Sequence, residues 1–92
     1  MPDAPQERRR SIRRTEHGIV FMVTTSAPER QRISGALIDV SDHGFRVRHL
    51  YAGFQPGEFV SFIHRKREGF ARVVWHKPEG SDFETGFSYS EE

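Results

Sequence analysis

A short stretch near the N-terminus concentrates side chains that bind phosphate and guanine. It contains five arginines and one acidic residue, Glu7, so residues 7–14 carry a local charge of 5 − 1 = +4 in a chain whose formal net charge is +1. A guanidinium group is planar and permanently charged, and it meets two phosphate oxygens, or the O6 and N7 acceptors of guanine, with paired hydrogen bonds. The arginines are Arg8, Arg9, Arg10, Arg13 and Arg14. They predict an anion-binding arm, with a merely solvated charged segment as the alternative.

A second cluster combines a carboxylate, a hydroxyl and a glycine in the D-x-S-x-x-G spacing of Asp39, Ser41 and Gly44. An aspartate accepts hydrogen bonds from both N1–H and N2–H of guanine, whereas adenine presents an acceptor at N1 and is rejected. Ser41 lies two residues after Asp39, so both side chains are expected on one face of a strand end, and Gly44 allows either a positive φ or a close backbone approach. An ordinary strand-end turn is the alternative for these three residues.

The elements that must position these side chains are predicted to be β-strands. From Gly18 onward, short runs rich in Val, Ile, Phe and Thr alternate with segments rich in Gly, Pro, Asp and Ser, which is typical of strands joined by turns. No stretch has convincing helical periodicity. The six predicted strands span residues 18–25, 32–40, 45–50, 58–63, 70–76 and 84–90.

Alternation within these strands indicates that one side of the sheet is buried. In residues 45–50, for example, Phe45, Val47 and His49 share one face, and Arg46 and Arg48 share the other. Six strands in so short a chain would leave open sheet edges unless the sheet closed on itself. The fold is therefore predicted to be all-β: a small six-stranded antiparallel β-barrel over residues 18–92, preceded by a flexible Arg-rich arm over residues 1–17.

Taken in order, the motifs resemble the PilZ domain, a bacterial receptor family for cyclic di-GMP. The R-x-x-x-R pattern of the arm is followed about 25 residues later by D-x-S-x-x-G. Near the C-terminus, A-R-V-V-W at residues 71–75 precedes T-G-F at residues 85–87, which is similar to the "rVvW…GF" strand pair of that family. The resemblance extends from Glu7 to about Tyr89. Either short motif alone is weak, whereas both in order within a six-strand pattern are fairly specific.

The resemblance implies roles for the arginines of the arm. Arg9 and Arg13 match the family's arm arginines, which hold phosphate and guanine. The overlapping pair Arg10 and Arg14 has the same spacing, so the R-x-x-x-R motif can also be aligned one residue later. Arg8 matches an arginine that accompanies the capture of two stacked, intercalated ligand molecules. The resemblance thus implies two molecules of cyclic di-GMP per chain.

The resemblance also implies contacts from the barrel. Asp39, Ser41 and Gly44 match the family's barrel-side contacts to the ligand. Trp75 matches a position whose ring borders the ligand, where it would stack on a purine. The alternation of the strand places Trp75 on the same face as Val73, and core packing, the usual role of a lone tryptophan in a small barrel, is the other possibility.

Composition and spacing argue against other chemistries. The chain has no cysteine and its five histidines lack tight ligand spacing, so no metal is expected. Asp39, Ser41 and His43 alternate along one strand, where side chains lie roughly 6 to 7 Å apart, so a hydrolytic triad is disfavoured and no enzyme activity is expected. Neither a signal peptide nor an apolar run of about 18 residues is present, which predicts a cytoplasmic protein without membrane insertion.

The resulting hypothesis is a monomeric second-messenger receptor. Ligand phosphates would cancel the repulsion between the arginines, and the ordered arm would present a changed surface to an unidentified partner protein. The resemblance connects such receptors with bacterial motility and biofilm formation. Two alternatives remain open: a PilZ-like adaptor that binds proteins without nucleotide, and an OB- or SH3-like barrel whose arm grips nucleic acid. The small net charge argues against nucleic-acid binding.

Overall fold

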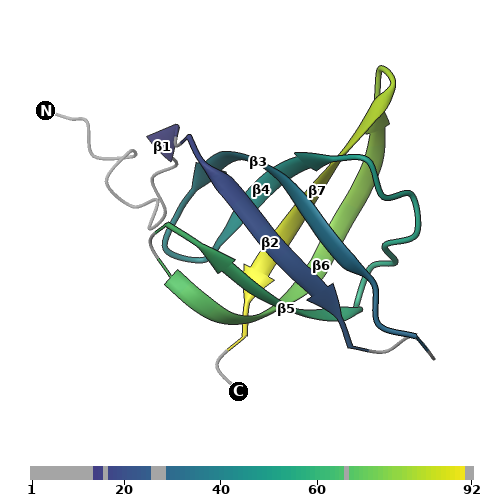
Figure 1. Cartoon of the computed structure of the whole chain (residues 1–92). Coiled ribbons are helices and arrows are strands. Elements are labelled where there is room, and N and C mark those ends of the chain that lie inside the picture. The colour runs from purple at the N-terminus through teal and green to yellow at the C-terminus, as the bar shows by residue number, and fades with distance from the viewer. Residues whose placement is uncertain (1–13, 16, 26–28, 66, 91–92) are drawn as a thin grey trace, which may run out of the picture.

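A computed structural model describes residues 14–15, 17–25, 29–65 and 67–90 of the chain. Every regular element within these ranges is a β-strand, and none of the described residues forms a helix long and apolar enough to span a bilayer. The strands are β1 (Arg14–Thr15), β2 (Ile19–Thr24), β3 (Arg32–Val40), β4 (Gly44–His49), β5 (Phe59–His64), β6 (Arg67–Glu79) and β7 (Asp82–Tyr89) (Figure 1).

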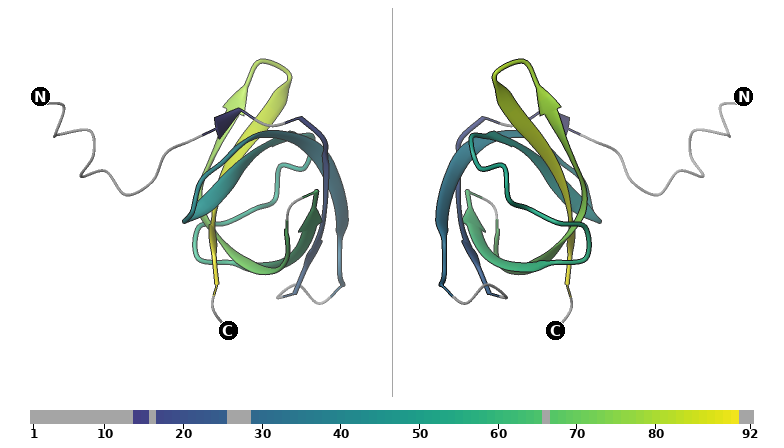
Figure 2. Two further views of the ribbon diagram at one scale, coloured as in Figure 1. Left: turned by 90° about the vertical axis from the view of Figure 1, so that its left-hand side faces the viewer. Right: turned by 90° about the vertical axis from the view of Figure 1, so that its right-hand side faces the viewer.

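Six of the strands close into an antiparallel barrel. Hydrogen-bonded neighbours follow the order β3-β2-β5-β6-β7-β4, and β4 pairs in turn with β3. Figure 2 looks along the barrel and shows the ribbon returning on itself. Closure satisfies the backbone groups that an open sheet would expose at its edges. The prediction of an all-β, six-stranded antiparallel β-barrel is thereby confirmed.

Two features of the strands differ from the sequence-based expectation. The hairpin of β6 and β7 continues beyond residues 76 and 84, because cross-strand pairing persists as far as Glu79 opposite Asp82 before the turn at Gly80, whose φ is +67°. In addition, Arg14 and Thr15, within the segment assigned to the arm, form the short strand β1. This strand pairs with the C-terminal end of β3, next to the position where β2 leaves it.

The core follows from the two-residue period of the strands. Phe45 and Val47 point inward from β4 and are fully buried, whereas the intervening arginine points outward, as the alternation predicts. The Phe45 ring stacks on Phe87 with 4.9 Å between ring centroids. Around this pair the core contains Val20, Met22, Ile33, Leu37, Phe54, Val60, Phe62, Ala71 and Val73.

Two β-bulges interrupt this period and change which side chains face outward. In β3, Leu37 pairs with Val47 and Asp39 pairs with Arg46, so Ile38 is an extra residue. Leu37 therefore lies in the core while Asp39, two residues later, lies beside an outward-facing arginine instead of sharing the face of Leu37.

The second bulge corrects the expected orientation of the tryptophan. In β6, Val73 pairs with Phe87 and Trp75 pairs with Gly86, so Val74 is the extra residue. Val73 is buried in the core, but Trp75 is carried to the outer surface and does not share the face of Val73. The expectation of a common face was wrong because one inserted residue reverses the alternation.

The same bulge turns His76 inward, where it joins a buried chain of hydrogen bonds. The amide of Tyr51 donates to Nδ1 of His49 at 3.1 Å, so the His49 proton lies on Nε2, which donates to the Thr85 hydroxyl at 2.6 Å. Thr85 then donates to Nδ1 of His76 at 2.7 Å. The remaining nitrogen, Nε2 of His76, is buried and has no hydrogen-bond partner among the described residues. Charging His49 would put a second proton against the Tyr51 amide.

We predict that the free energy of unfolding falls as the pH is lowered from about 6.5 to 4. Burial, and to a smaller extent His76, lowers the pKa of His49 from 6.5 to about 4. The unfolded chain therefore binds this proton first. The stability that neutral His49 contributes is complete above the unfolded pKa and decreases as the pH falls, by about 2–3 kcal/mol at the lower limit. Urea denaturation followed by circular dichroism at several pH values measures the loss.

Two variants separate this effect from general acid denaturation. His49→Gln is expected to be less stable at neutral pH and to lose less stability on acidification. His43→Gln, in an exposed turn, is the matched control and should keep the wild-type pH dependence. An acid loss of the same size in His49→Gln would contradict the assignment.

Candidate functional site

The strand register places a row of residues side by side across the outer surface of the barrel. Thr15 of β1 pairs with Asp39 of β3, and Asp39 pairs with Arg46 of β4. Arg46 pairs with Gly86 of β7, and Gly86 pairs with Trp75 of β6. Directly opposed residues have Cβ atoms about 5 Å apart. The row therefore joins the end of the arm, the aspartate of the second motif and the tryptophan, although they are far apart in sequence.

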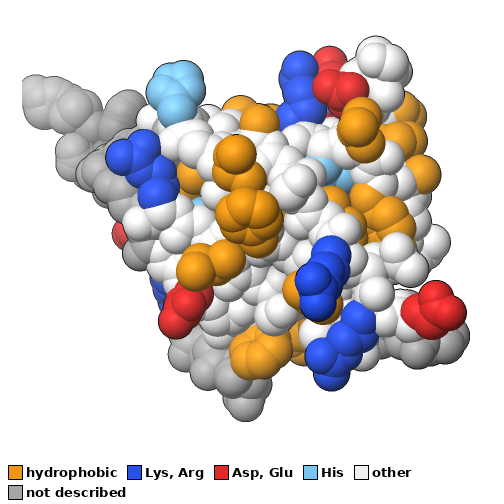
Figure 3. Space-filling model, viewed as in Figure 1, with side chains coloured by type: hydrophobic (Ala, Val, Ile, Leu, Met, Phe, Trp, Pro, Cys, Tyr) orange, Lys and Arg blue, Asp and Glu red, His pale blue; other side chains and the backbone are white. Residues whose placement is uncertain are grey.

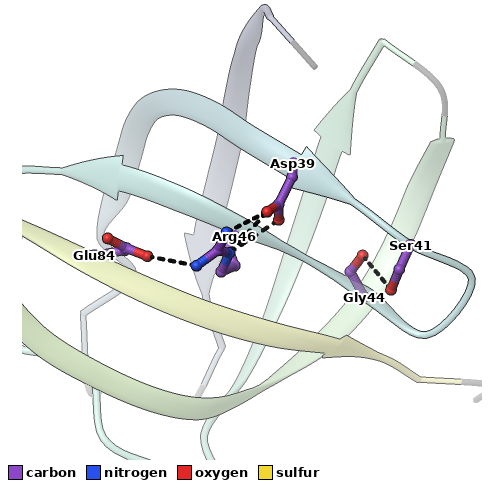
Figure 4. A network of polar contacts seen from close by, with 5 residues as sticks. All are labelled: Asp39, Ser41, Gly44, Arg46 and Glu84. Carbon is purple, nitrogen blue, oxygen red and sulfur yellow. Dashed lines mark hydrogen bonds and ion pairs between the residues drawn. The ribbon is translucent and has the colours of Figure 1, made fainter. Parts of the chain in front are cut away.

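A charged network occupies the centre of this row (Figure 4). Nε of Arg46 donates to both carboxylate oxygens of Asp39 at 3.0 Å, and its Nη2 also bonds to Asp39. Its Nη1 donates to Glu84 at 3.2 Å. The hydrogen bond to Asp39 is the main cause that raises the pKa of Arg46. The two carboxylates and one guanidinium of this network sum to 1 − 2 = −1, and Arg48 and Lys77 lie opposite Glu84 on the two neighbouring strands.

The two carboxylates are buried and the arginine between them is partly open. The side chains of Asp39 and Glu84 are 8% and 9% exposed, whereas that of Arg46 is 35% exposed. A ligand approaching from solvent therefore meets the guanidinium first. Buried carboxylates are costly unless paired, and Arg46 is a partner that both of them share.

The hairpin turn between β3 and β4 fixes the position of Asp39. The Ser41 amide donates to the Gly44 carbonyl at 2.8 Å, and the His43 amide donates to the Ser41 hydroxyl oxygen at 3.2 Å. This turn sets Asp39 opposite Arg46 in the register. Among the described residues, the Ser41 hydroxyl bonds to groups of the turn and not to Asp39, so the two residues of the motif have separate roles in this structure (Figure 4).

Gly44 is required by a close backbone approach and not by a left-handed conformation. Its φ is not positive, and a Cβ at this position would lie 1.9 Å from the Phe87 carbonyl oxygen of β7. The Tyr89 amide also donates to the His43 carbonyl at 2.9 Å. The turn thus fits directly against β7, which holds the second motif beside the row.

The tryptophan ring covers a glycine on the neighbouring strand. A Cβ on Gly86 would lie 2.4 Å from the indole of Trp75, so the absence of a side chain there lets the ring lie flat on β7. Trp75 is half-buried by this contact, and Lys77 lies over its ring at 5.7 Å from the centroid. The ring is therefore a surface element of the row and not the largest residue of the core.

The arm enters the site along β3. Arg14 pairs with Val40 and Thr15 with Asp39, so the chain that follows the arginine motif is anchored beside the second motif. Just beyond it, Arg65 of the hairpin between β5 and β6 donates to the His17 carbonyl at 2.9 Å. Of the arginines predicted to bind ligand, Arg8, Arg9, Arg10 and Arg13 lie outside the described residues.

Sequence reasoning missed two members of the site, Arg46 and Glu84. The sequence did contain a signal for Arg46. If residues 41–44 form the turn of a hairpin, counting outward from the turn puts Asp39 opposite Arg46. No local signal points to Glu84, which reaches the network only through the pairing of β7 with β4.

The described residues contain no group of three or more His, Cys, Asp or Glu side chains arranged to hold a metal ion. An open depression of about 590 Å³ near Arg48 and Tyr51 involves no residue of the row.

We predict that the two close-packed glycines differ in their tolerance of a methyl group. Gly44→Ala is expected to destabilise the fold by more than about 3 kcal/mol, because the clash is with backbone that cannot retreat without breaking the β4–β7 pairing. Gly86→Ala is expected to cost about 1–3 kcal/mol, because the Trp75 ring can turn away. Urea denaturation followed by circular dichroism compares the two variants. Emission from Trp75, the only tryptophan, should change in folded Gly86→Ala, and an unchanged spectrum would contradict the contact.

Comparison with known proteins adds no family to this description. No family model matches the chain, and no curated protein matches it.

Proposed function

We propose that this protein is a PilZ-like receptor that binds cyclic di-GMP between its arginine-rich arm and the outer row of the barrel. The observation that carries the proposal is the pairing of β1 with β3, because it brings the residues that follow the R-x-x-x-R motif alongside Asp39. Had the arm entered the barrel elsewhere, its arginines and this carboxylate would have no common ligand. The proposal includes no enzyme activity.

Charge supports the pairing of arm, ligand and barrel. The arm segment 7–14 carries +4, which an anionic ligand held between the arm and the barrel would neutralise. Each cyclic di-GMP has two phosphodiesters and a charge of −2. Two stacked molecules, the stoichiometry that Arg8 implies, bring −4 and match the charge of the arm.

Asp39 is occupied by Arg46 in the structure, so guanine recognition requires an exchange of partners. Arg46 offers the Asp39 carboxylate two adjacent N–H groups, and the Watson–Crick edge of guanine offers the same pattern through N1–H and N2–H. Guanine would replace Arg46 on the carboxylate without leaving it unpaired. Arg46, still bonded to Glu84, would then be free to meet a phosphate.

Trp75 would form the far border of the site. Its indole lies on Gly86, four strands away from β1 in the row, and the residue is only half-buried. A purine stacked there would gain about 1–3 kcal/mol.

Ordering about six residues of the arm costs on the order of 6–12 kcal/mol, against roughly 1.5–3 for each charge-assisted hydrogen bond. These terms favour micromolar affinity, about −8 kcal/mol.

Calorimetry with cyclic di-GMP, cyclic di-AMP and GTP tests the proposal. Binding is expected for cyclic di-GMP alone, with two molecules per chain. Arg13→Ala and Asp39→Asn are each expected to weaken binding at least about tenfold, because each removes a paired hydrogen bond to the ligand. Arg8→Ala is expected to reduce the fitted stoichiometry to one.

Arg30→Ala is the matched control for the arm substitutions. It removes one exposed positive charge before the opposite end of β3 and should leave the affinity within about twofold of the wild type. Circular dichroism must show that Asp39→Asn is folded, because this change weakens the pairing of Arg46. Equal affinity for cyclic di-AMP would contradict the guanine role of Asp39, and an equal loss in Arg30→Ala would reduce the arm to a non-specific charge effect.

Fluorescence provides a second prediction for the same site. Because Trp75 is the only tryptophan, quenching of its emission on titration with cyclic di-GMP reports a base close to its ring. Trp75→Phe is expected to retain most of the affinity and Trp75→Ala to lose about tenfold, since a flat ring is what stacking requires. Identical affinities for the two variants, together with an unquenched wild type, would remove Trp75 from the site.

The second candidate function is a PilZ-like adaptor that binds proteins and no nucleotide. The occupied state of Asp39 favours it, because a site that never binds guanine would keep its carboxylate neutralised by Arg46. Absence of heat with all three nucleotides, in a protein shown to be folded, would select this function.

A further inference from the structure

The first four residues of β3 have a strand neighbour on one side only. β3 pairs with β2 from Arg32 onward, whereas its pairing with β4 reaches no further than Ala36 opposite Arg48. β4 ends at His49, and the chain then leaves the sheet. The closed barrel therefore has an open strand edge over residues 32–35.

The alternation of the backbone shows which groups this edge presents. Gln31, directly before β3, accepts a hydrogen bond at its carbonyl from the Thr24 amide of β2 at 3.0 Å. Because the direction of backbone bonding alternates along a strand, the amides and carbonyls of Arg32 and Ser34 point the other way, toward the open edge. Among the described residues, neither makes a hydrogen bond to the chain that follows β4. The edge thus offers two donors and two acceptors to an incoming strand.

The depression of about 590 Å³ lies against this edge. Residues 31–36 line it on one side and residues 48–51, where the chain leaves β4, line it on the other, together with Asp82 of β7. Figure 3 views the side of the barrel on which β2 and β3 lie and shows hydrophobic side chains with Lys or Arg side chains beside them. We call this depression the edge groove. Four residues of strand span about 13 Å, so the open edge is long enough for a short added strand.

We propose that the edge groove binds an extended segment of a partner protein, which adds to β3 as a short antiparallel strand. The segment would occupy the line on which β4 would have continued beyond His49. Its backbone would complete the hydrogen bonds of Arg32 and Ser34. Alternating amides and carbonyls along an edge match another extended backbone, which is why strand addition is a recurrent mode of peptide recognition.

The register predicts which positions of the segment point inward and outward. Counting on from Ala36 opposite Arg48, the first free position lies opposite Ser34. The next two positions lie opposite Ile33 and then Arg32. Ile33 is buried in the core, whereas Ser34 and Arg32 are exposed. The segment should therefore place an apolar side chain inward against Ile33, between two outward side chains.

The charges around the edge groove define the two outward positions. Arg32 forms no ion pair among the described residues, so a carboxylate opposite it would be favourable. The position opposite Ser34 lies between Asp82, next in the β4–β7 register, and Arg48 at the end of β4. These two charges have opposite signs, as do those of the exposed residues 29–30 before β3, so an uncharged hydroxyl suits this position. The expected pattern is hydroxyl, apolar, carboxylate, as in Thr-Val-Glu.

A single extended segment suits the edge groove better than a second copy of this chain. The open edge lies in a depression beside Leu50 and Tyr51, and the same edge of another copy is recessed in the same way. The two barrel walls would meet before the two edges could pair. A separate segment has no such wall. The edge groove involves no residue of the outer row, so this inference does not depend on nucleotide binding.

Titration of the isotope-labelled full chain with the end-capped peptide Gly-Thr-Val-Glu-Gly, followed by amide NMR, tests the proposal. The amide signals of Arg32 and Ser34 are expected to shift. Methylation of the Thr amide nitrogen, which would donate to the Ser34 carbonyl, should raise the dissociation constant at least about tenfold. Methylation of the Val amide nitrogen, which points away from β3, is the matched control and should leave the constant within about twofold.

A charge exchange tests the register. Arg32→Glu is expected to lose binding of the Glu peptide and to bind Gly-Thr-Val-Lys-Gly instead. Arg30→Glu, an exposed change directly before the groove, is the matched control and should keep the wild-type preference. Circular dichroism checks that both variants are folded.

Three results would overturn the inference. Amide signals of Arg32 and Ser34 that do not move with about 1 mM peptide would exclude the site. Equal weakening by the two methylated peptides would exclude strand addition, and an unchanged preference in Arg32→Glu would exclude the proposed register. Protection of the two amides in the chain alone, together with a dimer in sedimentation, would assign the edge to a second copy instead.

Discussion

The structure depends on the register of a closed antiparallel sheet. In such a sheet every strand has two neighbours, so a shift in one strand must be accommodated by both. The side-chain period of two then assigns each residue to the core or to solvent. Two bulges, at Ile38 and Val74, are the places where this assignment changes. Which polar side chains are buried and which are exposed therefore changes at these two positions.

Each bulge has one consequence outside the barrel, and the bulge in β6 also has one inside. At Ile38, the insertion moves Asp39 away from the core and beside Arg46, where the carboxylate is paired instead of buried alone. At Val74, the insertion moves Trp75 outward onto Gly86 and turns His76 inward to Thr85. The inward position of His76 and the outward position of Trp75 are therefore products of the same backbone irregularity.

The barrel also separates its surfaces. The charged row lies over β3, β4, β7 and β6, with β1 at its border. The exposed apolar side chains of Ile19, Phe21 and Ile63 belong to β2 and β5, on the opposite side of the barrel. The ligand of the proposed receptor would meet the first of these two surfaces.

The sequence by itself determined the local properties. The alternation of Phe45 and Val47, the spacing of turn residues and the Asp39–Gly44 hairpin predict strands, inward faces and a barrel, because these depend on neighbours within a few positions. Tertiary structure alone decided the orientation of Trp75, the contact of Glu84 with Arg46 and the docking of β1 beside Asp39. These features need strands distant in sequence to pair in one register. A single unpaired residue reverses the face of everything that follows it until the next shift, and no local pattern marks where that residue lies.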